Sequence, residues 1–223
     1  MGNSNIIVIG IIVITSIISI KGFNDQEFFD RYKFNIRAIL IDKQWDRMIV
    51  SAFLHGDIAH LFFNMYTFYF FSSLVLNYGT ILFILTYFGS IIGGNTLALL
   101  MHKNNPYYSA IGASGGVSGI LFASIILDSQ IPIGIFPLPF SIPGWIFGII
   151  YLTYSLYGMK TQLGNIGHDA HLGGAIFGIL CGLGFVFLFP NHPYIYFNPL
   201  YFLLMMIPLV YLVFISFFND KNK

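Results

Sequence analysis

Seven long apolar stretches fill most of this 223-residue chain and limit the folds that it can adopt. A helix needs about 20 apolar residues to cross the roughly 30 Å hydrocarbon core of a bilayer. Only 9% of the residues are charged, against roughly 25% in a soluble domain, so the chain cannot build a water-facing shell. The sequence therefore predicts an all-α membrane protein with seven transmembrane spans, at 5–20, 59–77, 79–101, 112–127, 144–158, 168–189 and 196–218.

The connections between these spans leave no room for a soluble domain, and we predict a single polytopic membrane domain over 1–223. The longest connection, about 21–58, mixes aromatic and aliphatic residues with charged ones. That pattern favours short amphipathic helices in the membrane interface over a disordered linker, with Tyr32 and Trp45 at headgroup depth. The stretch 5–20 follows no basic leader and has no small-residue cleavage site, so we interpret it as a retained span rather than a signal peptide.

Charge and cysteine content exclude several classes of protein. A formal net charge of +1 provides no general basic surface for nucleic acid. The single cysteine, Cys181, excludes a disulfide framework and a thiolate metal cluster. With seven spans, all ten Lys and Arg residues fall on one side of the membrane, Lys221 and Lys223 of the tail included. The positive-inside rule assigns that side to the cytoplasm and the N-terminus to the outside.

Polar residues inside the predicted spans are candidates for function, because a bilayer makes them costly to bury. His60 and Asn64 are four residues apart, so they share one face near the start of the span 59–77, and His55 comes just before it. Taken alone, this pattern is equally consistent with polar side chains that join helices.

A stretch of small residues, Gly-Ala-Ser-Gly-Gly-Val-Ser-Gly at 112–119, opens the fourth predicted span. Its glycine spacing lets another helix approach closely. Ser114 lies at the predicted helix N-terminus, where free amide groups and the helix dipole favour a developing anion. Taken alone, the stretch favours a packing role, because serines are common in membrane helices.

A third polar group opens the sixth predicted span, where His171 heads a row of glycines. The glycines follow at +3, +7 and +11 and lie on the same side of the helix, at Gly174, Gly178 and Gly182. This groove lets another helix press closely against the helix that carries His171. Asp169 points to a different side, and we interpret it as a first-turn charge stabilised by the helix dipole. His168 is predicted to be an interface histidine rather than a second base.

Metal-dependent and aspartyl chemistry fit the sequence less well. No His-Glu-x-x-His pattern occurs, and a site made of four histidines would have only two carboxylates near it in sequence. Those histidines are His55, His60, His168 and His171. The predicted spans contain no pair of aspartates, which excludes an aspartyl-type intramembrane protease. A small transporter with a midplane site is disfavoured because the two halves show no inverted repeat.

Taken together and in this order, the three polar groups resemble the signatures of the rhomboid family of intramembrane serine proteases. The family patterns His-x4-His-x3-Asn, Gly-x-Ser-Gly and Ala-His-x-x-Gly-x-x-x-Gly are found here as His55, His60 and Asn64; Gly112, Ser114 and Gly115; and Ala170, His171, Gly174 and Gly178. Trp45 and Arg47 are similar to a Trp/Arg element of the first loop. The resemblance covers about 45–190 and implies a six-helix core with one additional C-terminal span at about 196–218.

The resemblance implies a serine endopeptidase with a Ser/His dyad, in which Ser114 is the nucleophile and His171 the general base. It also implies an oxyanion hole formed by His60, Asn64 and the Ser114 backbone N–H, with no cofactor and no metal ion. The implied partners are single-span transmembrane substrates and membrane lipids, without nucleic acid, and the oligomeric state stays open.

Two positions depart from the family pattern. Many members carry an aromatic residue four positions after the nucleophile, where this chain has Ser118, and the acidic residue often found near the end of the second span is missing. The alternative function is a non-catalytic rhomboid-like protein that binds and routes client helices. By resemblance to bacterial members, we expect a multi-pass protein of a bacterial cell (inner) membrane with its catalytic side outward. This orientation is opposite to the one that the positive-inside rule assigns from the Lys and Arg residues.

Overall fold

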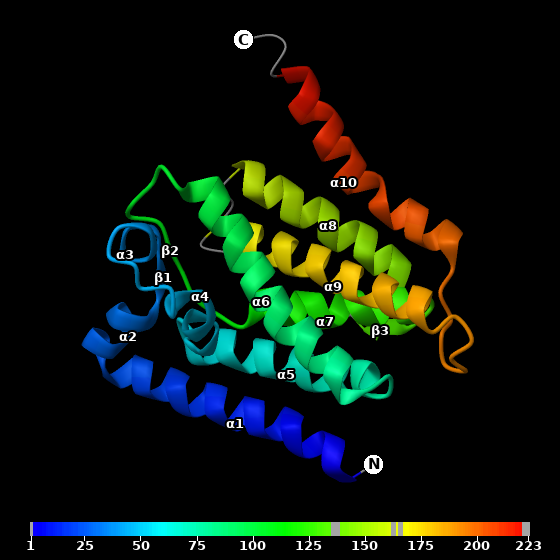
Figure 1. The fold of residues 1–223 in the computed structure, drawn as a ribbon, viewed down its shortest axis with the longest axis horizontal. Coiled ribbons are helices and arrows are strands. Elements are labelled where there is room, and N and C mark those ends of the chain that lie inside the picture. Colours follow the sequence, from blue (N-terminus) through cyan, green and yellow to red (C-terminus); the bar gives the residue numbers. More distant parts are fainter. Residues whose placement is uncertain (1, 135–138, 162–163, 165–166, 220–223) are drawn as a thin grey trace.

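The structure, a computed structural model, describes residues 2–134, 139–161, 164 and 167–219. Within these residues, one long helix corresponds to each of the seven predicted spans (Figure 1). The long helices are α1 (Gly2–Asn24), α5 (Ile58–Leu76), α6 (Thr80–His102), α7 (Ser114–Leu127), α8 (Gly144–Thr161), α9 (His168–Leu188) and α10 (Pro199–Asn219). The predicted boundaries agree with these to within a few residues, and α1 extends beyond its prediction at both ends.

Within the described part of the chain, four helices are long and apolar enough to cross a membrane, over Ile6–Asn24, Ile58–Leu76, Thr80–His102 and His168–Leu188. The same residues hold two more helical segments that are apolar but shorter, at Ser114–Leu127 and Pro199–Tyr211, and α8 falls in neither group. The predicted all-α membrane fold is therefore confirmed, whereas the count of seven spans stays a prediction.

The connection between α1 and α5 folds into short helices, as predicted for this loop. They are α2 (Gln26–Tyr32), α3 (Ile36–Leu40), α4 (Arg47–Val50) and the 3-10 helix η1 (Ser51–Phe53). Strand β1 (Phe34–Asn35) pairs antiparallel with β2 (Ser109–Ala110), which precedes α7. Buried Phe34, Ile36 and Ile39 pack with Ala98 of α6, so the loop is fixed to the helix bundle. Its depth in the membrane stays a prediction.

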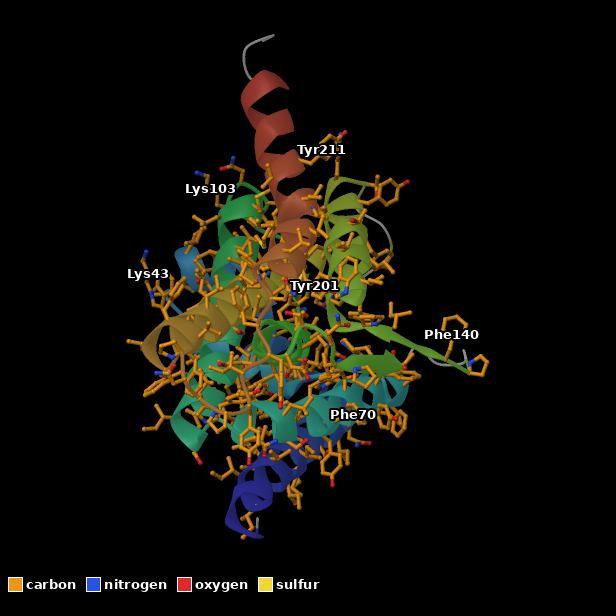
Figure 2. The ribbon with its side chains drawn as sticks, turned by 90° about the vertical axis from the view of Figure 1, so that its right-hand side faces the viewer. Lys43, Phe70, Lys103, Phe140, Tyr201 and Tyr211 are labelled. Atoms are coloured by element: carbon orange, nitrogen blue, oxygen red, sulfur yellow. The ribbon has the colours of Figure 1, made fainter. Side chains whose placement is uncertain are left out.

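A second pair of strands lies between α7 and α8 and forms a hairpin. Its strands are β3 (Pro132–Gly134) and β4 (Ser141–Pro143), which pair antiparallel with Ile133 opposite Ile142. The hairpin projects from the body of the molecule, and its exposed Phe140 points outward (Figure 2).

Helix α7 forms the centre of the bundle and contacts α5, α6, α8 and α9 (Figure 1). Every residue from Gly115 to Leu127 is buried, as expected for a helix that is apolar on all sides. Helix α1 packs on α5 at one edge, and α10 packs on α8 at the other. The large apolar side chains that face outward from α1 and α5 suit contact with lipid, for example Ile14, Ile17, Phe62 and Tyr66.

Candidate active site

Helices α7 and α9 touch through their glycines, which confirms the predicted groove on α9. A Cβ added at Gly174 would overlap the carbonyl oxygen of Gly115, and one added at Gly178 would overlap that of Gly119. Near the other end of the groove, a Cβ at Gly182 would lie 2.8 Å from the Cβ of Ile126. Side chains larger than hydrogen would force the helices apart, so these glycines set the distance between the two backbones.

This contact brings together the helix ends that carry Ser114 and His171. Ser114 is the first residue of α7, and His171 lies in the first turn of α9. The Ala170 carbonyl oxygen would be 3.2 Å from a Cβ at Gly115, so the residues next to Ser114 and His171 are in contact. Both side chains are half-buried. Among the described hydrogen bonds, none joins the two side chains directly; such bonds are often long in a free enzyme and tighten when substrate binds.

The His60 imidazole lies beside Ser114, against the backbone of Gly112. A Cβ at Gly112 would be 3.0 Å from His60 Nε2 and 3.8 Å from Ser114 Oγ. Gly112 also has φ +112°, a conformation that favours glycine. Asp57 caps α5 by accepting the His60 backbone N–H at 2.7 Å, which fixes the turn that carries the imidazole.

Asn64 lies one turn further along the same face of α5 and is buried. Its side-chain amide donates to the His60 carbonyl at 3.0 Å, within its own helix. At the start of α7, the backbone N–H groups of residues 114–116 have no acceptor among the described hydrogen bonds. These donors, together with the helix dipole, favour negative charge beside Ser114.

His55 holds the residue before the candidate nucleophile. The Ser19 hydroxyl of α1 donates to the Phe53 carbonyl at 2.8 Å, so His55 Nδ1–H donates to Ser19 Oγ at 2.9 Å. His55 Nε2 then accepts the Ala113 backbone N–H at 3.4 Å. Burial is the main cause that lowers the pKa of His55 to about 3, and the neighbouring His60 lowers it further. The neutral form that this network needs is therefore the stable one.

The His171 ring meets an aromatic side chain that the sequence did not indicate. Tyr151 of α8 lies with its ring centroid 6.3 Å from that of His171, at an interplanar angle of 29°. The Tyr151 hydroxyl is hydrogen-bonded to Ser118 Oγ. Ser118 stands where many family members carry an aromatic residue, and in this chain it contacts an aromatic residue from another helix, Tyr151 of α8.

The other polar residues at the start of α9 contact helices α6 and α8. Asp169 is buried and pairs through Oδ2 with His102 Nε2 of α6 at 2.6 Å, which agrees with its predicted orientation away from His171. No pattern in the sequence marks His102 as its partner. His168 is buried, and its ring lies 5.2 Å from that of Tyr154 of α8, which supports its predicted interface role.

Arg47 and Trp45 occupy different environments in the first loop. The buried Arg47 side chain donates to the carbonyls of Asp30 at 2.9 Å and Lys33 at 2.6 Å, and to Gln44 Oε1 at 2.7 Å. Trp45 is exposed. Arg47 therefore fixes the shape of the loop and does not contact Ser114 or His171. Among the described residues, no group of three or more His, Cys, Asp or Glu side chains is arranged to hold a metal ion.

The chain matches the Rhomboid domain family model over residues 42–187. It is 29% identical over 145 residues to RHOMBOID-like protein 12, mitochondrial, of Arabidopsis thaliana, covering 57% of this chain and 43% of that protein. It is 30% identical over 141 residues to Rhomboid protein 1, mitochondrial, of Saccharomyces cerevisiae, covering 60% and 40%. Rhomboid-like protease 3 of Toxoplasma gondii is 42% identical over 77 residues, covering 34% and 28%. The chain matches less than half the length of each relative.

These relatives contradict the expected bacterial cell (inner) membrane. All three are eukaryotic, and the names of the first two place those proteins in mitochondria. The expectation was wrong because it came from the bacterial members of the family, while the sequence motifs carry no sign of the host. The family model covers more than half of the chain, and the chain therefore belongs to the rhomboid family.

Proposed function

We propose that this chain is an intramembrane serine endopeptidase that cleaves single-span transmembrane proteins. The observation that supports this most is the glycine contact between α7 and α9, which holds the helix ends of Ser114 and His171 together. A serine hydroxyl is a weak nucleophile without an adjacent base, and a half-buried imidazole on the neighbouring helix can supply that base. The name of one relative, Rhomboid-like protease 3, is in keeping with this activity.

The proposed reaction has two steps. Ser114 Oγ attacks the substrate carbonyl while His171 accepts the hydroxyl proton, and His171 then gives that proton to the leaving amine. Water, activated by the same base, hydrolyses the acyl-enzyme. The oxyanion would be stabilised by the free N–H groups at the start of α7 and by the side chains of His60 and Asn64. Loss of one such donor typically costs about 3 kcal/mol of transition-state stabilisation.

The proposal includes seven spans in a single membrane domain over 1–223, with a rhomboid-like core at about 45–190. Ser114 begins a short helix that is buried below its first residue, so water must reach it through a polar opening. His55, His60 and Asn64 supply polar groups on that side. A substrate helix would have to unwind locally to present its carbonyl, since helical carbonyls are already hydrogen-bonded.

Cleavage of a tagged single-span substrate in reconstituted membranes tests the function. Ser114→Ala and His171→Ala are each expected to abolish cleavage while expression and folding persist. Ser124→Ala is the matched control, because Ser124 lies on the same helix and its hydroxyl is bonded to the Ile120 carbonyl. Cleavage that persists in Ser114→Ala would refute the serine mechanism.

The alternative, a protein that binds client helices without cleaving them, is favoured by the missing direct hydrogen bond between Ser114 and His171 among the described contacts. Labelling with a fluorophosphonate separates the two functions, because an inactive serine does not react with this probe. Labelling of the wild type that is lost in Ser114→Ala supports the protease. A wild type that binds single-span proteins and is not labelled supports the alternative.

A further inference from the structure

We propose that Tyr151 of α8 is a positioning residue that orients the His171 imidazole, and that Ser118 of α7 anchors it. This inference rests on the proposed protease function. It concerns a residue on a helix that carries none of the motifs found in the sequence, and it explains why position 118 is a small hydroxyl residue in this chain.

The Tyr151 ring offers His171 a nearly parallel face. Their centroids are 6.3 Å apart at 29°, within the range in which aromatic pairs attract each other. The other described ring contact of His171 is with His168, also at 6.3 Å but steeply tilted at 69°. Rotation of the imidazole out of its plane would lose the contact with Tyr151, so Tyr151 restrains that rotation.

Two hydrogen bonds through the Ser118 hydroxyl connect Tyr151 to the first turn of α7, which begins at Ser114. Ser118 Oγ donates to the Ser114 carbonyl at 2.7 Å. Because a serine hydroxyl has one proton, the Tyr151 hydroxyl must be the donor in its bond with Ser118 Oγ. Tyr151 is thus connected through Ser118 to the backbone of the candidate nucleophile, while its ring lies beside the candidate base.

Two further rings hold Tyr151 from its other sides. Phe122 of α7 lies edge-on at 5.4 Å and 66°, and Phe147 of α8 lies at 5.9 Å and 34°. With the hydroxyl also bonded, the Tyr151 side chain has little freedom of its own. A rigid neighbour can orient His171, whereas a mobile one could not.

In a Ser-His-Asp triad a carboxylate orients the histidine, but no carboxylate is hydrogen-bonded to His171 among the described residues. The nearest acid in sequence, Asp169, is occupied by His102 of α6. Orientation of the imidazole must then come from packing, and Tyr151 is the ring that packs parallel to it among the described residues. We infer that Tyr151 acts through His171 and does not itself contact the substrate.

Kinetics of the purified full-length protein test this role. Tyr151→Leu removes the ring face and is expected to lower kcat about tenfold, with KM changed by less than about twofold, because the lost contact acts on the base and not on substrate binding. Tyr151→Phe keeps the face and should stay within about threefold of the wild type. Tyr154→Leu is the matched control one turn along α8, since its ring contacts His168 and not His171, and it should leave kcat unchanged.

The pH dependence of fluorophosphonate labelling, normalised to folded protein, distinguishes positioning from a purely structural role. The midpoint of labelling against pH should move in Tyr151→Leu and stay in place in Tyr154→Leu. If Tyr151→Leu does not fold, Ser118→Ala removes the hydrogen bond to the Tyr151 hydroxyl, as Tyr151→Phe does, and both should move the midpoint in the same direction by a smaller amount. If the midpoint and kcat are unchanged in these variants while Ser114→Ala is inactive, the proposed role of Tyr151 is wrong. The proposed protease function would then still hold. Activity in Ser114→Ala would instead overturn the protease itself.

Discussion

The backbone of Gly174 on α9 lies directly against the carbonyl of Gly115 on α7, the residue that follows Ser114. Gly174→Ala is expected to destabilise the protein by about 1–3 kcal/mol, because the added methyl meets backbone that cannot move aside. It should also slow fluorophosphonate labelling of Ser114 by separating the two helix ends. Thermal unfolding in detergent measures the first effect. Gly184→Ala on the same helix is the control, since a Cβ there meets nothing within 4 Å; equal losses in both variants would contradict the argument.

The buried pair of Asp169 and His102 predicts a second stability effect. It joins the start of α9 to the end of α6 at 2.6 Å, and the two side chains are only 5% and 13% exposed. Asp169→Ala removes the acceptor and leaves buried His102 Nε2 without this partner, so it is expected to lower the free energy of unfolding by about 1–3 kcal/mol, the usual cost of a buried polar group that loses its hydrogen bond. Chemical or thermal unfolding checks this value. Asp42→Ala, at an exposed position, should have almost no effect, and a similar loss there would show that the pair is not the cause.

The helix positions could be predicted from the sequence because lipid imposes a run of apolar residues of fixed minimum length. The span 59–77 lies within one residue of α5 at each end. The glycine face of α9 could be predicted as well, since its period of 3.6 places Gly174 and Gly178 beside His171 whatever the partner helix is. Local patterns of this kind predict where a helix begins but not which helices pack against it. Asp57, the N-cap of α5, is an example.

The long-range partners could not be predicted. Ser19 meets His55 across 36 residues, His102 meets Asp169 across 67, and Tyr151 meets Ser118 across 33. No local pattern marks these pairs, because each depends on which helix packs beside which. The sequence indicated only that the aromatic residue was missing at position 118, and the structure supplies one from α8.

Burial of neutral His55 predicts that the protein loses stability in mild acid. Its pKa falls from the ordinary 6.5 to about 3 in the folded state, so the unfolded chain binds a proton between these values and the folded chain does not. Stability from this group is therefore full above pH 6.5 and is lost as the pH falls toward 3, by about 1.4 kcal/mol per pH unit. Unfolding measured from pH 7 to pH 4 should show a shallower decline in His55→Asn, which cannot take up that proton. The same slope in both proteins would contradict the assignment.

The structure of the first loop is expected to depend on the planar guanidinium group of Arg47. Its buried side chain donates through Nη1 to the carbonyls of Asp30 and Lys33 and through Nε to Gln44. Lysine has one nitrogen at the end of a flexible chain and cannot reproduce this fork. Arg47→Lys is therefore expected to destabilise the protein by about 1.5–3 kcal/mol, because at least one hydrogen bond to a charged group is lost.

Limited proteolysis of the first loop and thermal unfolding both measure this effect. Arg37→Lys is the matched control, since Arg37 is exposed on α3 and makes no side-chain hydrogen bond or ion pair within the described part of the chain. Faster cleavage in Arg47→Lys than in Arg37→Lys would locate the loss in the loop. Equal cleavage rates would mean that apolar packing of Phe34 and Ile39 on α6 holds the loop without Arg47, and that the Arg of the loop-one motif is dispensable for its shape.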